Sequence, residues 1–318
     1  MSDPPGGSRW RRSLEFRIYQ AQARWRTLGA QWSLFRERPF GLLGLVLIAV
    51  FGVMAVIHPF LMGTVWNRAV YDPIVGFDLA VGQHPSPPTL QHLLGTDNFG
   101  RDVLSQLIAG TRTSFGVGIV AALVAVTLST LLGAAAGYFG GTVDLVLMGV
   151  ADVFVLMPAP VVMLIVGLLL RLEWPAVGIG YGLLAGLGGQ MIVVKAQTLT
   201  VKVRPFIEAA RTAGGGHLHI IRKHVLLSLV PIAIVHGVFT VVGAVLTESL
   251  LSFFGRTSYH LSWGMMIWLG QETFRWFSTR GQWHAIVPPA VAIMLYCGAF
   301  YLVGRALDEV FNPRLRRR

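Results

Sequence analysis

The sequence predicts an all-α integral membrane protein with six transmembrane helices and one short cytoplasmic helix between the fourth and the fifth. Three observations support this fold class. Hydrophobic residues make up 54% of the 318 residues and charged residues only 13%, about half the charged fraction of a soluble domain. Six apolar runs each approach the roughly 20 residues that cross a bilayer. Lys and Arg gather in alternate connections between these runs.

The N-terminal segment, residues 1–39, is basic and periodic. Its apolar residues recur at steps of four or three, at Trp10, Leu14, Ile18, Ala21, Trp25, Leu28, Trp32 and Phe35. This spacing predicts an amphipathic helix that lies on an anionic membrane surface, with arginines on its other side. A coiled-coil seam is the alternative, and alanine and tryptophan at core positions disfavour it.

The six spans are expected at 40–62, 115–137, 147–170, 175–194, 225–250 and 284–305. Only a tight turn around Arg171–Trp174 separates the third from the fourth, which predicts an antiparallel hairpin. The chain is thus divided into the segment 1–39, a first transmembrane helix at 40–62, an extracytoplasmic loop at 63–114, a transmembrane core at 115–305 and a basic tail at 306–318.

The positive-inside rule sets the orientation. Of the 26 Lys and Arg residues, nineteen lie in 1–39, 195–224 and 305–318, and seven lie in the other connections. Both termini and the 195–224 connection are therefore expected in the cytoplasm. Two termini on the same side of the membrane require an even number of spans, which agrees with six.

Two long connections are expected on the outer side. The first, 63–114, is rich in Pro, Asn, Asp and Gly, and the pattern after Asp102 predicts a short amphipathic helix at the outer interface. The second, 255–283, contains four tryptophans, Trp263, Trp268, Trp276 and Trp283, a pattern typical of an interfacial aromatic belt. These loops are expected either to cap a cavity and meet an extracytoplasmic partner or to act as passive anchors.

Glycines at four-residue spacing predict close helix packing inside the spans. They occur at Gly133 and Gly137 and again at Gly178, Gly182 and Gly186. Small residues at this spacing let helix backbones approach one another in a membrane. The string GIGYGLLAG follows no strand, so packing is favoured over dinucleotide binding.

The stretch 204–224, RPFIEAARTAGGGHLHIIRKH, predicts a short helix, a glycine break and a second helical start. Pro205 suits the first helical position and Glu208 suits the first turn, while the glycines from Gly214 onward can end a helix. Phe206, Ile207, Ala210 and Ala213 are expected near one face. Such a helix is too short to span a bilayer, so we expect it to dock on another protein.

Several kinds of chemistry are disfavoured. The chain has no Gly-Lys pair, so a P-loop is impossible and ATP hydrolysis is not expected in this chain. His217, His219 and His224 lack supporting cysteines or carboxylates, which favours hydrogen bonding in an interface over a metal site. The single cysteine, Cys297, excludes an intramolecular disulfide. Nucleic-acid binding is also disfavoured, because aromatic and basic residues are not interleaved on a soluble domain.

Two ionisable residues fall inside the predicted fifth span. Glu248 lies near its outer end and His236 nearer its middle. A carboxylate at the centre of a transmembrane helix costs roughly 2.5–3.5 kcal/mol, so Glu248 is expected to face a partner or a wet cavity. Both are candidate residues of a solute pathway. For Glu248, snorkelling or a helix–helix hydrogen bond is the alternative.

The segment EAARTAGGGHLHIIRKHVL resembles the cytoplasmic EAA signature of ABC importer permeases. Further matches are LLGTDNFGRDVLSQLIAGTRTS, GYFGGTVDLVLMGVADVFVLMP, LTESLLSFFG and SWG, in that order. Together they resemble the dipeptide/oligopeptide/nickel subfamily over residues 30–313. The chain departs from the family pattern at Gly149 and Lys195, where arginines are common, and at Leu227 and Ser228, where the family has proline and asparagine.

The resemblance implies a type I ABC importer permease fold in a cell membrane. It implies a second homologous permease, two cytoplasmic ATPase subunits that bind ATP and Mg, and an extracytoplasmic binding protein that delivers peptides or a related small solute. The coupling helix would be 204–224, with ATPase-coupling residues Arg204, Phe206, Glu208, Ala209, Ala210, Gly214 and His224. Two alternative functions stay open from the residues alone. One is a stand-alone secondary transporter or channel, in which Glu248 and His236 would serve ion coupling, and the other is a membrane scaffold.

Overall fold

The computed structural model describes residues 29–255, 260–277 and 283–312, and all of its regular elements within these ranges are helices. Residues 29–36 are helical, whereas most of the predicted N-terminal helix and the end of the basic tail lie outside the described residues. The remaining helices are α2 (Pro39–Thr64), α3 (Arg68–Tyr71), α4 (Val103–Phe139), α5 (Gly141–Leu156), α6 (Ala159–Leu169), α7 (Trp174–Leu187), α8 (Gly189–Lys202), α9 (Pro205–Thr212), α10 (His217–Ile220), a π-helical turn η1 (Ile221–Val225), α11 (Leu226–Phe253), α12 (Trp263–Phe277) and α13 (Trp283–Phe311).

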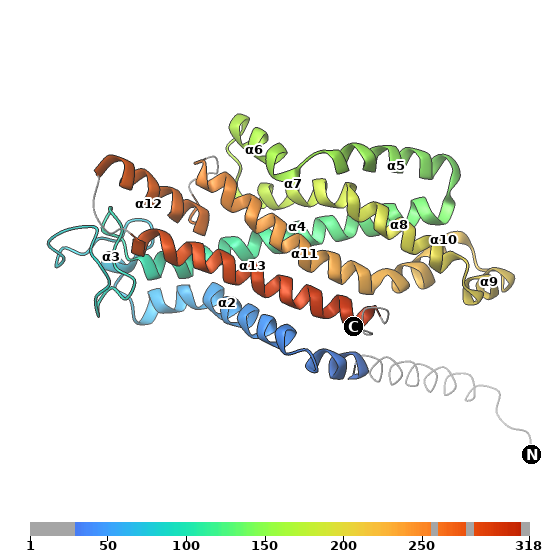
Figure 1. Ribbon diagram of the computed structural model, residues 1–318, viewed down its shortest axis with the longest axis horizontal. Helices are drawn as coiled ribbons and strands as arrows, with labels where there is room; N and C mark the ends of the chain where they lie inside the picture. The colour runs from blue at the N-terminus through green and yellow to red at the C-terminus, as the bar shows by residue number, and fades with distance from the viewer. Residues whose placement is uncertain (1–28, 256–259, 278–282, 313–318) are drawn as a thin grey trace, which may run out of the picture.

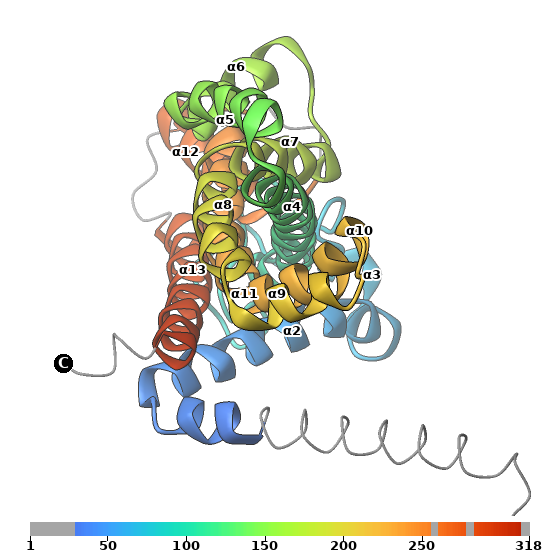
Figure 2. The same cartoon turned by 90° about the vertical axis from the view of Figure 1, so that its right-hand side faces the viewer.

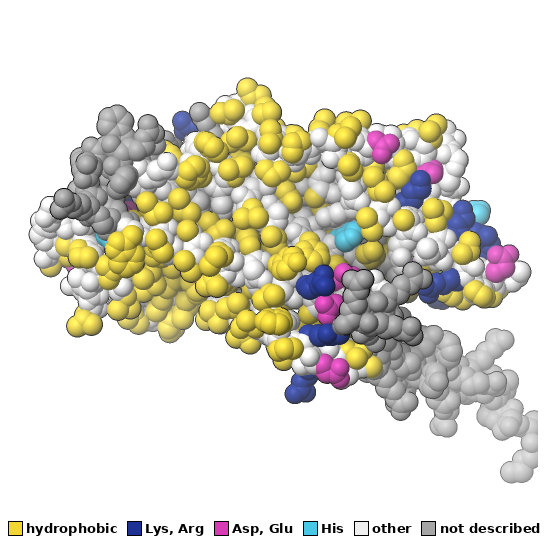
Figure 3. Space-filling model, viewed as in Figure 1, with side chains coloured by type: hydrophobic (Ala, Val, Ile, Leu, Met, Phe, Trp, Pro, Cys, Tyr) yellow, Lys and Arg dark blue, Asp and Glu magenta, His cyan; other side chains and the backbone are white. Residues whose placement is uncertain are grey.

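The long helices run side by side along the long axis of the molecule (Figure 1). The loop around α3 lies at one end, and α9 and α10 lie at the other. Apolar side chains cover the face between the two ends, while charged side chains gather toward α9 and the C-terminal part of α13 (Figure 3). This distribution suits a protein whose middle faces lipid.

Four helices are long and apolar enough to cross a membrane: α2, α4, the continuous run from α10 to α11, and α13. Two further pairs, α5 with α6 and α7 with α8, satisfy the same criteria only when each pair is taken together. By length and composition, the described chain therefore has four unbroken candidate spans, or up to six if each bent pair counts as one. The predicted six runs all fall on these helices.

The third predicted span, 147–170, is not one straight helix. α5 and α6 meet at an angle of 79° around Met157 and Pro158. Pro158 has no N–H to donate to the preceding turn, and proline disfavours helical geometry in the residue before it; Met157 is accordingly extended. The fourth predicted span bends by 43° at Gly188. An ion pair between Lys195 and Asp144, 2.5 Å long, joins α8 to α5.

α4 is the central helix and packs against α7, α8 and α11 (Figure 2). A Cβ atom at Gly182 would lie 2.7 Å from the carbonyl oxygen of Ala121, and one at Gly133 would lie 2.7 Å from that of Met191. Only glycine allows backbones to approach this closely. The predicted packing role of the spaced glycines is therefore confirmed.

α4 also begins earlier than the sequence suggested. Its 37 residues start at Val103, and the Asp102 carboxylate accepts a hydrogen bond of 2.6 Å from the Ser105 N–H at the N-cap. The expected separate interfacial helix forms the first turns of α4 instead. At 1.5 Å per residue the helix is about 55 Å long, longer than the hydrocarbon core of a bilayer.

Trp263 lies in the core and not in an aromatic belt, so this part of the belt prediction is wrong. Its ring packs 5.5 Å from the rings of both Phe51 and Tyr296, and its indole N–H donates to the Leu107 carbonyl at 3.0 Å. Trp283, in contrast, is 60% exposed, and its place in an aromatic belt stays a prediction. The aromatic cluster ties α2, α4, α12 and α13 together at the α3 end.

Candidate coupling helix and solute pathway

α9 is a helix of eight residues that projects at the end of the molecule (Figures 1 and 2). Arg204 is its N-cap residue, and Glu208 lies in its first turn. The Gly214 and Gly215 N–H groups donate back to the carbonyls of Arg211 and Ala210, both at 2.9 Å. Gly214 has φ +81°, a conformation that glycine adopts at no steric cost. The predicted helix, glycine break and second helical start are all present.

One side of α9 is anchored to the membrane-spanning helices. Ile207 is fully buried in a cluster with residues of α4, α8 and the continuous helix that runs from α10 through η1 to α11. Burial of a side chain of this size stabilises the contact by about 1.5–3 kcal/mol. Ala210 packs at the edge of the same cluster. A displacement of α9 would therefore act directly on three other helices.

The other side of α9 is exposed. Phe206 is 41% exposed, Ala209, Ala213 and Gly214 are exposed, and the Glu208 side chain lies 3.9 Å from Arg211 with 71% of its surface accessible. Phe206 and Ala213 thus do not share the buried face of Ile207, contrary to the sequence-based expectation. An exposed aromatic ring beside charged residues makes a suitable protein-docking surface.

His224 lies close to this surface. Its ring centroid is 6.1 Å from that of Phe206 and 6.2 Å from that of His219. The structure therefore brings the seven predicted coupling residues together at one end of the molecule. Ser228 donates a 2.8 Å hydrogen bond to the His224 carbonyl, and the helix continues through Leu227 without a break.

Tyr138, at the end of α4, was missed from the sequence. Its hydroxyl is 3.0 Å from Nδ1 of His217, while the Lys202 ammonium and the Arg211 guanidinium lie 5.7 and 5.8 Å from its ring centre. Cations at this distance over an aromatic face are attracted to it. The ring joins α4 to α8, α9 and α10.

Glu248 is fully buried near the end of α11. Ser252 donates a 2.6 Å hydrogen bond to its Oε1, and Nε2 of His260 lies 3.6 Å from the same oxygen. Its Oε2 has no hydrogen-bond partner within the described residues. Ser262, at the start of α12, donates to Ser252 at 3.2 Å. The carboxylate thus belongs to a polar network between α11 and α12.

His236 lies twelve residues before Glu248 on α11, about 18 Å along the helix axis. It is half-buried, and its Nδ1 has no hydrogen-bond partner in the described part of the chain. Thr240 donates to the His236 carbonyl at 2.7 Å and accepts from Gln190 of α8 at 2.8 Å. The two predicted pathway residues therefore do not form one site.

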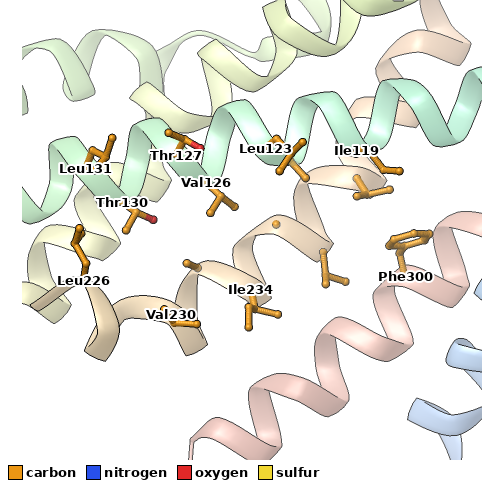
Figure 4. A pocket seen from close by; sticks show the side chains of 15 residues that line it. Ile119, Leu123, Val126, Thr127, Thr130, Leu131, Leu226, Val230, Ile234 and Phe300 are labelled. Atoms are coloured by element: carbon orange, nitrogen blue, oxygen red, sulfur yellow. The ribbon is translucent and has the colours of Figure 1, made fainter. Parts of the chain in front are cut away.

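Two cavities border α11. An apolar groove of about 610 Å³ lies between α4, α11 and Phe300 of α13 (Figure 4). Its walls include Leu123, Val126, Val230 and Ile234. A second cavity, of about 600 Å³ and mixed polar and apolar lining, lies between the α9-proximal ends of α8, α11 and α13. Neither was foreseen, because each combines residues more than 100 positions apart.

A buried charged cluster organises the loop before α4. His92 is fully buried, with Nδ1 2.8 Å from Asp102 and Nε2 3.2 Å from Asp78. A hydrogen bond from the Ala80 N–H lowers the pKa of Asp78, and His92 adds to this effect. Burial raises the pKa of Asp102, although the Ser105 N–H and His92 oppose the rise. The cluster fixes the loop to the first turn of α4.

Comparisons with known proteins agree with this architecture. Residues 129–317 match the family model described as "Binding-protein-dependent transport system inner membrane component". The chain is 32% identical to the dipeptide transport system permease protein DppC of Bacillus subtilis, over 90% of this chain and 85% of that protein. It is 31% identical to the oligopeptide permease OppC of Haemophilus influenzae (72% and 73% covered) and 30% identical to the nickel permease NikC of Escherichia coli (72% and 81% covered). The chain belongs to the family of binding-protein-dependent transport system inner membrane components and is a multi-pass permease subunit of an ABC importer.

Proposed function

We propose that this permease forms half of a transmembrane pathway, with a second homologous permease as the other half. Two cytoplasmic ATPase subunits bind ATP and Mg and supply the energy, and an extracytoplasmic binding protein delivers the solute. Both termini and α9 face the cytoplasm. The concentration of Lys and Arg in the connections at the α9 end supports this orientation.

One observation carries the proposed coupling role of the segment 204–224. α9 buries Ile207 among α4, α8 and the continuous helix from α10 to α11, and it exposes Phe206 and Glu208 on its other side. A helix held in this way transmits force, because a partner that grips the exposed face moves the cluster around Ile207. Closure of the ATPases would push or pull α9 and rock the spans between inward-open and outward-open states.

The proposed solutes are short peptides or related small solutes. The names of the relatives include dipeptide, oligopeptide and nickel permeases, and the dipeptide permease covers most of this chain. Glu248 and His236 are proposed as pathway residues, each with a polar atom that has no partner within the described residues, Oε2 and Nδ1 respectively. Such atoms can bind a polar solute or a group from the second permease.

A charge reversal tests the coupling assignment. We expect Glu208→Lys to abolish transport and to weaken co-purification of the ATPase subunits by at least about tenfold, while membrane insertion is unchanged. Glu173→Lys is the matched control, since Glu173 is also exposed and lies before α7, away from α9. Unchanged ATPase association in Glu208→Lys would refute the coupling role of this surface.

A further inference from the structure

The cavity of about 600 Å³ beside α9 has polar groups on three helices. Gln197 and Thr200 come from α8, Ser228 from α11 and Asp308 from α13, and Arg204 links the cavity to α9. Pro231, Ile232, Val235 and Phe311 supply an apolar wall. Small-molecule sites commonly have this size and this combination of apolar walls with a few polar groups.

Asp308 differs from the neighbouring carboxylate on α13. Glu309 forms ion pairs with Arg38 at 3.2 Å and with Arg305 at 3.1 Å. Asp308 lines the cavity and has no ion pair within the described residues. His236 is close enough to interact electrostatically with Asp308 but forms no ion pair with it. A partly buried carboxylate without an ion pair is a suitable partner for an ammonium group.

Arg204 shows the same contrast at the other wall. Arg211, seven residues later, pairs with Glu208, whereas Arg204 lines the cavity and has no ion pair to a described residue. Its guanidinium can bind a carboxylate through two parallel hydrogen bonds. The Ser228 and Thr200 hydroxyls donate to carbonyls of their own helices, both at 2.8 Å, which leaves their oxygens as acceptors toward the cavity.

We propose that this cavity binds a zwitterionic solute, a short peptide with free termini, at the cytoplasmic end of the pathway. Arg204 binds the carboxylate, Asp308 binds the ammonium group, and the wall of Pro231, Ile232 and Val235 accommodates side chains. The proposal rests on the proposed function, since it locates a site for the solute that the importer releases. Because Arg204 also begins α9, the bound solute contacts the proposed coupling helix directly.

The test uses the purified transporter complex without its binding protein and measures equilibrium binding of labelled dialanine. In the wild type, N-acetylation or C-terminal amidation of dialanine should each weaken binding by at least about tenfold. In Asp308→Asn, N-acetylation should no longer weaken binding, whereas amidation should weaken it as in the wild type. In Arg204→Gln, amidation should no longer weaken binding, whereas N-acetylation should weaken it as in the wild type. Glu309→Gln and Arg305→Gln are matched controls that should keep both penalties. Equal binding of the blocked and free peptides, or both penalties intact in Asp308→Asn, would overturn the proposal.

A second measurement keeps the proposal testable if a charge variant fails to assemble. Cys297 is the only cysteine and is buried, so Thr200→Cys or Ser228→Cys on a Cys297→Ala background gives one reactive thiol in the cavity. A hydrophilic thiol reagent added to inside-out vesicles should label it, and dialanine should slow the labelling at least about fivefold. Absence of labelling, or labelling that dialanine leaves unchanged, would overturn the proposal.

Failure of this site and failure of the proposed function give different results. ATP-dependent import of dialanine with the binding protein, together with no dialanine protection of the cavity, would reject the site alone. An assembled complex that imports no peptide would reject the proposed solute class, and with it the zwitterion site.

Discussion

Gly214 offers the sharpest test of how α9 is built. Gly214→Ala places a Cβ on a residue with φ +81°, while no heavy atom lies within 4 Å of that Cβ. The cost therefore comes from the backbone alone, about 1–2 kcal/mol for a left-handed non-glycine residue. This energy corresponds to a factor of about 5–30 in the equilibrium for opening of the helix end.

Gly216→Ala is the matched control. Its Cβ would also meet no atom within 4 Å, but Gly216 has φ −67° and ψ 158°, which alanine adopts without strain. Gly216 is the N-cap residue of α10, and glycine is preferred to alanine at an N-cap, so we expect a cost of about 1 kcal/mol there. This cost falls on the first turn of α10 and not on the amides that close α9.

Hydrogen exchange of the Gly214 and Gly215 amides in the purified complex measures the effect, since both donate to carbonyls of α9. Gly214→Ala should speed their exchange about 5–30-fold, and Gly216→Ala should leave it within about fivefold of the wild type. Equal exchange in the two variants would refute the argument that the positive φ of Gly214 holds the end of α9.

Two further predictions concern stability. Gly182→Ala should destabilise the complex by about 1–3 kcal/mol, because its Cβ would lie 2.7 Å from the Ala121 carbonyl oxygen. The control Gly149→Ala, with no atom within 4 Å of its Cβ, should be neutral or slightly stabilising in thermal unfolding. Equal melting temperatures of the two variants would refute the packing argument. Asp78→Asn should lower the melting temperature at pH 7. The lowered pKa of Asp78 means that its carboxylate stabilises the fold above its ordinary value of 3.8, and this contribution is lost as the pH falls through the lower folded value, so the difference between variant and wild type should narrow there. A constant difference from pH 7 to pH 3 would contradict the assigned role of the carboxylate.

Local chemistry predicted the parts of the fold that depend on short segments. The apolar runs identified the positions of the spans, and Pro205, Glu208 and Gly214 identified the beginning and end of α9. The spaced glycines correctly indicated the contacts of Gly133 and Gly182 with neighbouring backbones. These features depend on residues within one or two helical turns, so one sequence suffices to predict them.

Features that depend on distant contacts were missed. Trp263 belongs to a segment rich in tryptophan that was expected to be an interfacial loop, but it begins α12 and its N–H reaches the Leu107 carbonyl, 156 positions away in the sequence. Pro158 marks a break in the chain, but it does not give the angle of 79° between α5 and α6. The pairing of Asp78 and Asp102 with His92 spans 24 residues of irregular loop, where no periodicity relates the side chains.

The geometry around Arg204 relates the coupling helix to the second cavity. Two residues earlier, Lys202 ends α8 beside the ring of Tyr138, and three residues later Ile207 enters the buried cluster. Because this connection is short and anchored at both ends, α9 cannot move far without moving the side chain of Arg204. Motion of α9 would change the distance between the Arg204 guanidinium and Asp308 on α13. The motion of α9 that is proposed to open the spans would therefore also alter the affinity of the cavity for a zwitterion. Solute release would in this way depend on the state of the ATPases.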